Sequence, residues 1–264
     1  MHSGPMPTDT QRRAAEHLFA ARRANRAGDR IDPSCRPATV EEGLAVQRAL
    51  TAMLEAQLNE RIAGWKCSAP TEERSVSAAP VFASGIQHSS PCRLLPRAGL
   101  APVEPEIAFV LGRDLPPRAS PYTEAEVRAA IAETRLVLEL IASRYADPAA
   151  VSFPEFLADH VSNQGLLVGP LVSTGAGEVP AHITLDVLAP GLAREREGRH
   201  PDGNPLLPLY WLANFLNASG DALKAGQIVT TGSYAGVIEV PLGTPVHIRF
   251  GELGVIDAVF EAAR

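Results

Sequence analysis

The chain has 264 residues, of which 45% are hydrophobic and 20% are charged, a balance typical of a globular protein with room for one large domain or two small ones. Its net charge of -6 and its isoelectric point near 5.7 argue against nucleic acid as the main partner, because binding to phosphates needs a basic surface. No apolar run approaches the roughly 20 residues that a membrane-spanning helix needs, and the N-terminus lacks the apolar centre of a signal peptide, so we expect a cytoplasmic protein without a membrane partner. The cysteines are odd in number and widely spaced, which favours reduced structural thiols over a disulfide framework or a zinc motif: Cys35, Cys67 and Cys92.

Two amphipathic helices are predicted at the start of the chain. Residues 9–27 have helical spacing, with alanine and leucine toward one side and arginine toward the other, and Gly28 is a natural stop. Thr39 and Glu42 then form a capping box for a second helix, which carries apolar residues as far as Leu58. The apolar positions of both helices are most simply explained as core.

The short apolar segment at residues 62–68 contains Lys66 directly after Trp65. One interpretation is a surface lysine whose alkyl stem packs on the protein while its charge stays in water. The other is a lysine near an acidic metal site, where it donates protons or stabilises an enolate. Residues 69–102 are rich in Ser, Pro and Ala and predict a long, partly ordered loop with short strands, and such loops are often functional.

A strand-like apolar run at residues 103–110 contains two carboxylates two positions apart, Glu104 and Glu106. In an extended backbone such positions point to the same side, so we expect the two residues about 6 to 7 Å apart. A solvated strand face, with Pro105 marking a sheet edge, is one interpretation. The other is a pair of acids with a positive charge between them.

A second apolar run, residues 136–142, contains one acid, Glu139. It predicts a strand buried on both faces, where an ionised carboxylate is costly unless it is paired or bound to a metal. An ion pair with Arg144 or Arg249 is one interpretation. The other is a hard divalent cation, because three carboxylates without clustered thiolates or imidazoles favour Mg²⁺ or Mn²⁺ over zinc.

A helix is predicted between these two strands, because Thr123 and Glu126 form a further capping box. A strand–helix–strand crossover would bring the second strand back beside the first, and all three acids would then meet. Residues 153–160 predict another short helix, which ends at Asp159 and His160. These two side chains either bracket the site or are, more commonly, a helix-end acid and a surface histidine.

The C-terminal part of the chain predicts a helix at residues 208–223, with one apolar side in the core, and a terminal hairpin at residues 246–260. Between them, residues 227–233 predict a strand that runs into a Gly–Ser turn. Exposed amides and the hydroxyls of Thr231 and Ser233 could bind a substrate carboxylate there. A plain turn is the other interpretation.

Several short motifs follow one another in order along the chain: Gly64-Trp65-Lys66, Val103-Glu104-Pro105-Glu106, Leu138-Glu139 followed by Ser143-Arg144, Ala158-Asp159, Thr230-Thr231-Gly232-Ser233 and Phe250-Gly251-Glu252-Leu253-Gly254. This ordered set resembles the 2-keto-4-pentenoate hydratase branch of the fumarylacetoacetate hydrolase superfamily, from about residue 10 to the end of the chain. The resemblance implies an α+β fold, a β-rich roll with flanking helices that is usually assembled as a homo-oligomer. Residues 1–60 would be an N-terminal helical segment and residues 61–264 the catalytic domain, as one structural unit.

The resemblance also implies a chemistry. Hydratases of this branch convert a small dienoic acid, 2-hydroxypenta-2,4-dienoate (2-keto-4-pentenoate), to 4-hydroxy-2-oxopentanoate in aromatic catabolism. By this resemblance Mg²⁺ or Mn²⁺ would bind to three acids, in agreement with the argument from spacing and burial: Glu104, Glu106 and Glu139. A catalytic lysine and a turn that holds the substrate carboxylate would complete the site: Lys66, and Thr231, Gly232 and Ser233.

One departure from the branch concerns an acidic residue in the loop after the lysine motif, which corresponds here to Ala78. A missing acid could change proton delivery or indicate another reaction, and related 2-oxo-3-hexenedioate (4-oxalocrotonate) decarboxylases use the same metal and the same type of enolate. Carbon–carbon bond hydrolases of the superfamily need a His–Glu lid motif, for which the chain has no match. A metal-binding protein of this fold without catalysis is the third possibility. The sequence leaves open the length and charge of the substrate tail, the choice between the two metals and the number of subunits.

Overall fold

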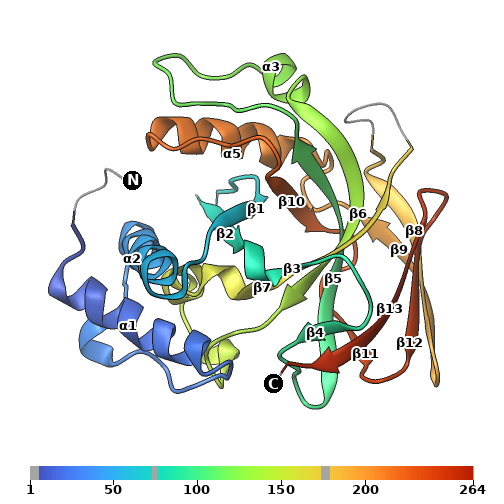
Figure 1. The fold of residues 1–264 in the computed structure, drawn as a ribbon, viewed down its shortest axis with the longest axis horizontal. Helices are drawn as coiled ribbons and strands as arrows, with labels where there is room; N and C mark the ends of the chain where they lie inside the picture. Colours follow the sequence, from blue (N-terminus) through green and yellow to red (C-terminus); the bar gives the residue numbers. More distant parts are fainter. Residues whose placement is uncertain (1–5, 73–75, 174–178, 264) are drawn as a thin grey trace.

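The computed structural model describes residues 6–72, 76–173 and 179–263, which fold into two β-sheets with helices around them (Figure 1). The five α-helices of this part of the chain are α1 (Asp9–Arg23), α2 (Val40–Leu58), α3 (Glu124–Arg128), α4 (Phe153–Ala158) and α5 (Leu207–Ala218). Four 3₁₀ turns accompany them: η1 (Pro33–Cys35), η2 (Ala83–Gly85), η3 (Pro148–Ala150) and η4 (His160–Ser162). No helix in the described ranges is both long enough and apolar enough to cross a membrane.

The larger sheet has eight strands in the order β2-β1-β10-β5-β6-β7-β3, with β11 also paired to β5, and the second sheet has five in the order β4-β13-β12-β8-β9. The strands are β1 (Ile62–Ser68), β2 (Ser77–Phe82), β3 (Ile86–Gln87), β4 (Cys92–Leu94), β5 (Leu100–Leu111), β6 (Ile131–Ile141), β7 (Asn163–Leu171), β8 (His182–Ala189), β9 (Leu192–Arg199), β10 (Ile228–Ser233), β11 (Ile238–Pro241), β12 (Pro245–Phe250) and β13 (Val255–Ala262). In Figure 1 the larger sheet curls around the middle of the molecule, with α1 and α2 on one side and the second sheet on the other. The predicted α+β roll with flanking helices is confirmed.

The first helix ends earlier than predicted. It stops at Arg23, and Asn25 follows with a left-handed φ of 46°. The amide of Arg26 then bonds back to the carbonyl of Ala21 at 3.2 Å, which closes the helix end without glycine. The predicted stop at Gly28 was therefore wrong, because asparagine also tolerates the left-handed conformation that a helix end needs.

The second helix follows the sequence closely. The predicted capping box is confirmed, because the Thr39 side chain accepts from the Glu42 amide and the Glu42 side chain accepts from the Thr39 amide. Helices α1 and α2 share a small apolar core with residues from outside the two helices. The fully buried or nearly buried members of this core include Leu18, Leu50, Leu54, Phe82 and Tyr145.

Strands β5 and β6 lie side by side, but they are antiparallel, with Glu104 directly opposite Glu139. The predicted crossover was wrong, although the predicted capping box of Thr123 and Glu126 is present. Helix α3 has only 5 residues, so it is about 7.5 Å long. It cannot span β5, whose 12 residues extend about 40 Å, and the chain instead turns back into β6 at the same end.

The two faces of the larger sheet differ, because successive residues of a strand point to opposite sides. Ile107 and Phe109 of β5 belong to the main apolar core, which β12 and β13 of the second sheet also line. Glu104, Glu106 and Ala108 point the other way, and we call this side, with Glu139 opposite Glu104, the acid face. A separate apolar cluster continues the acid face beyond the glutamates: Val81, Ala108, Val137, Leu166, Val168 and Ile228.

The C-terminal predictions hold with two adjustments. The terminal hairpin is confirmed as the antiparallel pair β12 and β13. Helix α5 stops at Ala218, short of the predicted residue 223, and Gly220 follows with a φ of 76°. Its apolar side is only partly core, because Leu212 and Leu216 are buried while Trp211 is partly exposed.

Candidate metal centre and active site

Three carboxylates that are far apart in the sequence meet on the acid face. The register of β5 and β6 places Glu104 opposite Glu139, and Glu106 lies two positions along β5 on the same side. One carboxylate oxygen from each of the three lies within 4.8 Å of the others. Glu139 is completely buried and Glu106 is 3% exposed, whereas Glu104 is partly open to solvent. The predicted convergence of the acids therefore occurs, through antiparallel pairing.

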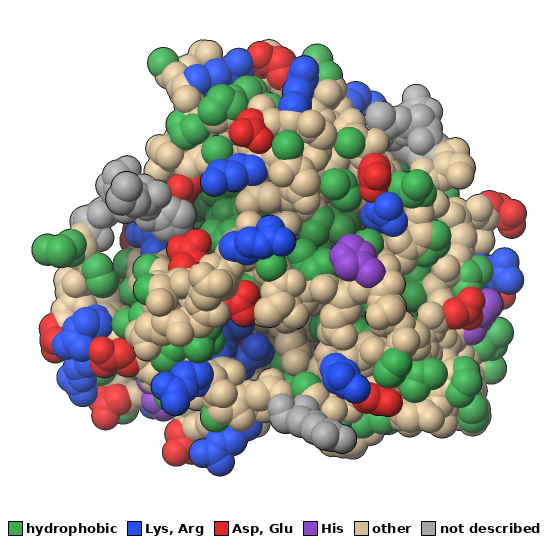
Figure 2. Space-filling view, in the orientation of Figure 1, with side chains coloured by type: hydrophobic (Ala, Val, Ile, Leu, Met, Phe, Trp, Pro, Cys, Tyr) green, Lys and Arg blue, Asp and Glu red, His purple; other side chains and the backbone are tan. Residues whose placement is uncertain are grey.

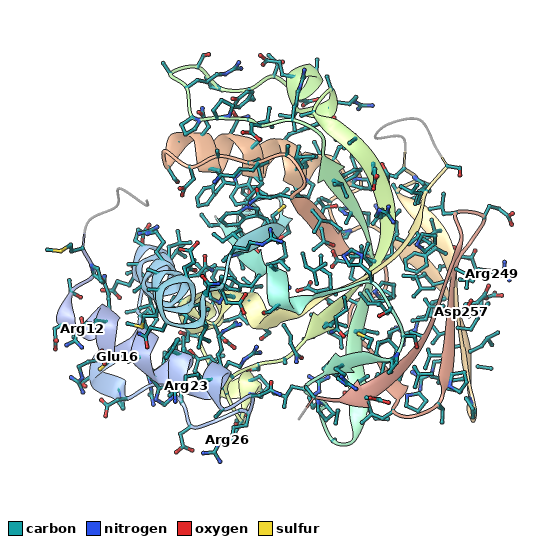
Figure 3. The ribbon with its side chains drawn as sticks, in the orientation of Figure 1. Arg12, Glu16, Arg23, Arg26, Arg249 and Asp257 are labelled. Carbon is teal, nitrogen blue, oxygen red and sulfur yellow. The ribbon has the colours of Figure 1, made fainter. Side chains whose placement is uncertain are left out.

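Lys66 is the ion-pair partner of Glu139. Its Nζ lies 2.6 Å from Oε1 of Glu139, and the lysine side chain is only 14% exposed. The predicted arginine pairs were wrong: Arg249 is exposed on the outer side of β12 (Figure 3), and the Arg144 guanidinium bonds to the carbonyl of Ala142. Lys66 reaches the acid because β1 pairs with β10, and β10 pairs with β5. The interpretation of Lys66 as a snorkelling surface lysine is therefore also wrong.

Two further groups hold the carboxylates from outside the predicted set. The side-chain amide of Asn163 donates to Oε1 of Glu139 at 2.8 Å. The hydroxyl of Thr230 and the amide of Gly232 both donate to Oε2 of Glu106. Oε2 of Glu139 is buried and has no hydrogen-bond partner among the residues that the structure describes. A buried carboxylate oxygen without a partner is costly, so this oxygen needs a further partner, such as a cation.

The charges of the site do not balance. Burial, together with the charge of Glu139, raises the pKa of Glu104 to about 7. Burial and the charges of the other two acids raise the pKa of Glu106 to about 8. Burial alone would lower the pKa of Lys66, but the three carboxylates outweigh it and keep that pKa above its ordinary value. Three acids thus face one ammonium group, and a divalent cation would relieve their mutual repulsion.

The donor set fits the metal that the sequence predicts. Carboxylate oxygens are hard ligands of the kind that Mg²⁺ and Mn²⁺ prefer, and the unpartnered Oε2 of Glu139 is a ready ligand atom. Within the described ranges, no other group of three His, Cys, Asp or Glu side chains lies close enough to share an ion. Glu104, Glu106 and Glu139 are therefore the residues that would hold it.

The predicted carboxylate-binding turn lies beside the acids. The hydroxyl of Ser233 is within hydrogen-bond distance of two carbonyls, at 3.3 Å from Pro105 and 3.2 Å from Gly236. The Thr231 hydroxyl is buried and has no partner in the described part of the chain. The amide of Gly232 is occupied by Glu106, and its φ of 132° is one that side-chain-bearing residues rarely adopt. The turn thus holds the carboxylate of Glu106, and its role toward a substrate stays a prediction.

Asp159 and His160 are not surface groups. Both are completely buried, so the expectation of a surface histidine was wrong. Asp159 ends α4 as predicted, pairs with Arg22 at 3.3 Å and accepts from the Arg144 amide at 2.7 Å. His160 Nε2 lies 2.9 Å from the hydroxyl of Thr51. Neither residue belongs to the acid cluster, although both come just before Val161, whose carbonyl accepts from Lys66.

Ala78 lies in strand β2, opposite Cys67, and not in a loop. Its side chain belongs to the main core, on the face opposite to the acids. The neighbouring positions that share the side of Lys66 are Ala79, directly opposite it, and Ser77 two residues before. An acid at position 78 would therefore point into apolar side chains, and its absence there does not remove a group from the site.

A cavity of about 150 Å³ lies farther along the acid side of β5 and β6, and none of the three acids lines it. Pro102 lines it two positions before Glu104 on β5, and Ile141 lines it two positions after Glu139 on β6. Its only charged lining residue among those described is Arg97, whose guanidinium is paired with Glu239 at 2.7 Å. The cavity wall is otherwise mostly apolar: Leu95, Pro96, Ala142, Ala146 and Pro148. Figure 2 shows one face of the molecule, where hydrophobic side chains line a central hollow beside a histidine; the 150 Å³ cavity has no histidine in its lining and is a different feature.

Three contacts of the site could not be found from sequence patterns. Asn163 begins β7 and Thr230 lies within β10, and both are ordinary polar residues. The carbonyl of Val161, which accepts from Lys66 Nζ at 3.1 Å, carries no side-chain signal. The sequence did show more acids than basic residues in its apolar runs, and this imbalance indicated that further hydrogen-bond donors were needed. Their identity depends on strand register.

Comparison with known proteins places this site in context. A search of protein-family models found no match. A 2-keto-4-pentenoate hydratase of Paraburkholderia xenovorans strain LB400 is 29% identical over 168 residues, which cover 61% of this chain and 59% of that protein. A 4-oxalocrotonate decarboxylase of a Pseudomonas species is 29% identical over 163 residues, covering 59% of each. The chain therefore matches about three-fifths of the length of these curated relatives.

The fold itself is shared over nearly the whole chain. The structure of 4-oxalocrotonate decarboxylase from Pseudomonas putida G7, complexed with magnesium and adipate, superposes with a TM-score of 0.77 at 20% identity and covers 96% of this chain and 98% of that one. Structures of fumarylacetoacetate hydrolase family proteins are also among the matches. The chain thus has the fold of the fumarylacetoacetate hydrolase superfamily, and its sequence resembles the 2-keto-4-pentenoate hydratase branch of that superfamily.

Proposed function

We propose that the protein is a divalent-metal-dependent hydratase, a hydro-lyase that adds water to 2-hydroxypenta-2,4-dienoate and forms 4-hydroxy-2-oxopentanoate in the catabolism of aromatic compounds. The observation that carries the proposal is the convergence of Glu104, Glu106 and Glu139 with Lys66 beside them. The similarity to curated hydratases supports this choice of reaction. The magnesium in the structurally similar decarboxylase supports Mg²⁺ or Mn²⁺ as the cofactor.

The residues of the site divide the chemistry between them. A bound divalent cation supplies Lewis acidity toward the 2-oxygen and carboxylate of the substrate. Lys66 is held as an ammonium between Glu139 and the carbonyl of Val161, so it enters the reaction as a proton donor. The dienol becomes an enone when its hydroxyl proton is lost and carbon 5 gains one. Water then adds its oxygen to carbon 4 and a proton to carbon 3, which balances the hydration.

The cavity next to Pro102 and Ile141, on the acid side of β5 and β6, is our candidate place for an uncharged substrate tail. Arg97 is its one charged lining residue in the described chain, and that guanidinium already has a carboxylate partner in Glu239. A second substrate carboxylate would have to compete with Glu239 for Arg97. This favours the hydratase substrate, whose tail is an uncharged vinyl group, over the dicarboxylate substrate of a decarboxylase. The turn of Thr231, Gly232 and Ser233 remains our candidate for the substrate carboxylate.

The first test follows the ultraviolet absorbance of 2-hydroxypenta-2,4-dienoate with the purified protein in Mg²⁺ or Mn²⁺, then after EDTA. We expect metal-dependent loss of the diene and a product heavier by one water. Lys66→Met should lower kcat/KM by about 10²- to 10⁴-fold, the usual contribution of a proton-transfer group. Lys224→Met, at an exposed lysine, is the matched control and should keep full activity.

A second candidate is a 4-oxalocrotonate decarboxylase, which the similarity to that enzyme of a Pseudomonas species favours. Release of carbon dioxide from 2-oxo-3-hexenedioate, without hydration of the pentadienoate, would establish it. Metal binding without turnover of either substrate would support a non-catalytic member of the fold.

We also propose a cytoplasmic homo-oligomer without nucleic acid or membrane partners. Light scattering of the purified protein tests the assembly.

A further inference from the structure

The chain makes an unusual backbone turn next to the candidate metal centre. Three consecutive residues of η4 have left-handed φ angles: His160 at 53°, Val161 at 55° and Ser162 at 55°. None of them is glycine, and a left-handed backbone is unfavourable for any residue that carries a Cβ atom. A β-branched residue such as Val161 is a pronounced outlier there. Strain of this kind persists only where the surroundings impose it, and it concentrates at functional sites.

Contacts from several elements impose the turn. Arg22 of α1 is 9% exposed, and its Nη2 lies 3.1 Å from the carbonyl of Asp159 and 3.4 Å from that of Asn163, so one guanidinium clamps both ends. The amide of Ala142, just after β6, donates to the carbonyl of Ser162 at 2.8 Å. Inside the turn, the Val161 side chain is 5% exposed. The conformation is therefore fixed from both ends and from the sheet.

The turn supplies two groups to the metal centre. The carbonyl of Val161 accepts from Lys66 Nζ at 3.1 Å, and the side-chain amide of Asn163 donates to Oε1 of Glu139 at 2.8 Å. Lys66 Nζ is 2.6 Å from the same Oε1. Both nitrogen donors to Glu139 therefore use Oε1. A carboxylate held by one oxygen in this way has its other oxygen fixed in direction, and that oxygen is the buried, unpartnered Oε2.

We propose that Asn163 is a positioning residue of the metal centre: with Lys66 it holds Oε1 of Glu139, so that Oε2 is presented as a ligand atom beside Glu104 and Glu106. The inference rests on the metal site of the proposed function. A neutral amide donor suits the task, because it orients the carboxylate without competing for the cation. The strained turn is the device that brings Asn163 to this place, since an ordinary helical continuation of α4 would carry the chain away from β6.

The test measures Mn²⁺ affinity by titration, with free Mn²⁺ followed by its electron paramagnetic resonance signal. Asn163→Ala should weaken binding about 10- to 100-fold, the usual cost of losing a group that orients a metal ligand. Gln164→Ala is the matched control, because this neighbouring amide accepts from the Leu95 amide and does not touch the acids. It should change the affinity less than about threefold. Unchanged Mn²⁺ affinity in Asn163→Ala would overturn the positioning role and leave the proposed function standing.

A double-mutant cycle separates positioning from general structural damage. In a Glu139→Gln background, Asn163→Ala should no longer weaken Mn²⁺ binding, because the ligand that it orients is gone. In a Glu104→Gln background it should still weaken binding by the full factor. Equal losses in both backgrounds would overturn the proposal.

Folding is checked by thermal unfolding in EDTA. Asn163→Ser keeps a small polar side chain in the buried position and replaces the alanine variant if that one does not fold. Its hydroxyl is too short to reach Glu139 in the same way, so the same loss of affinity is expected. Absence of Mn²⁺ binding by the unaltered protein would instead refute the proposed metal-dependent function, together with this role.

Discussion

Glu104 and Glu106 are expected to keep their protons at a pH where exposed glutamates are ionised. Burial and neighbouring acids raise their pKa values to about 7 and about 8 in the metal-free site. In the unfolded chain both groups ionise near pH 4.5, so the folded protein binds more protons than the unfolded one between that pH and about 8. Stability from these groups is thus present at low pH and is lost as the pH rises.

We therefore expect the metal-free protein in EDTA to lose stability from pH 5 to pH 8, by at most about 1.4 kcal/mol per pH unit for each proton involved. Thermal or urea unfolding across this range measures the slope. Glu106→Gln should flatten it, because glutamine cannot ionise. Saturating Mg²⁺ or Mn²⁺ should oppose the loss, since the cation binds the ionised acids. An identical slope in the unaltered protein and Glu106→Gln would contradict the pKa assignment.

The left-handed turn η4 is an element whose strain can be measured. Ser162 has a φ of 55°, and its side chain makes no hydrogen bond that the structure records within the described residues. Glycine adopts this conformation freely, whereas alanine keeps the strain. We expect Ser162→Gly to be more stable than Ser162→Ala by about 1 kcal/mol, as measured by urea unfolding.

A matched pair at Ser143 checks this interpretation, because Ser143 does not have a positive φ. There the order should reverse, with the glycine variant less stable than the alanine variant by about 0.4–1 kcal/mol, since glycine adds entropy to the unfolded chain. An alanine variant more stable than the glycine variant at both positions would show that the turn is not strained. The strain of this turn bears on the site, because the turn places Asn163 against Glu139 and the carbonyl of Val161 against Lys66.

At the scale of the whole molecule, the larger sheet separates a core face from an acid face. The cysteines report on this packing: all three are free and buried, Cys67 and Cys92 in the main core and Cys35 in the core of the N-terminal helices. The prediction of reduced structural thiols is confirmed for the described chain. Burial raises the pKa of Cys92 to about 12 and that of Cys67 well above its ordinary value.

We expect a thiol reagent at pH 8 to modify Cys67 and Cys92 only after the protein unfolds, because reaction needs an accessible thiolate. Mass spectrometry of the native protein and of the protein in urea, after equal exposure to iodoacetamide, measures this. Rapid labelling of either residue in the native state would mean that the two sheets open readily. The division of the chain at residue 60 stays a prediction. Urea unfolding of the same protein tests it, because two separate units would unfold in two transitions and one unit in a single transition.

Local features were predictable from the sequence because they depend on neighbouring residues. The capping boxes at Thr39 and Thr123 need only a hydroxyl and a carboxylate three positions apart, and both are present. The shared side of Glu104 and Glu106 follows from the pleat of a strand alone. The sequence correctly predicted that a buried Glu139 needs a partner, because burying an unpaired carboxylate is costly, but it did not identify that partner.

Partners across the fold were decided by tertiary structure, because they depend on which strands pair and in what register. Lys66, rather than an arginine, meets Glu139 because β1, β10, β5 and β6 are neighbours in one sheet. Asn163 reaches the same carboxylate because a left-handed turn, clamped by Arg22, redirects the chain from α4 into β7. By itself the sequence determined the kinds of group that the site needs, since burial and charge are properties of residue types. Their pairing and direction depend on contacts between distant segments, and only the folded chain brings those segments together.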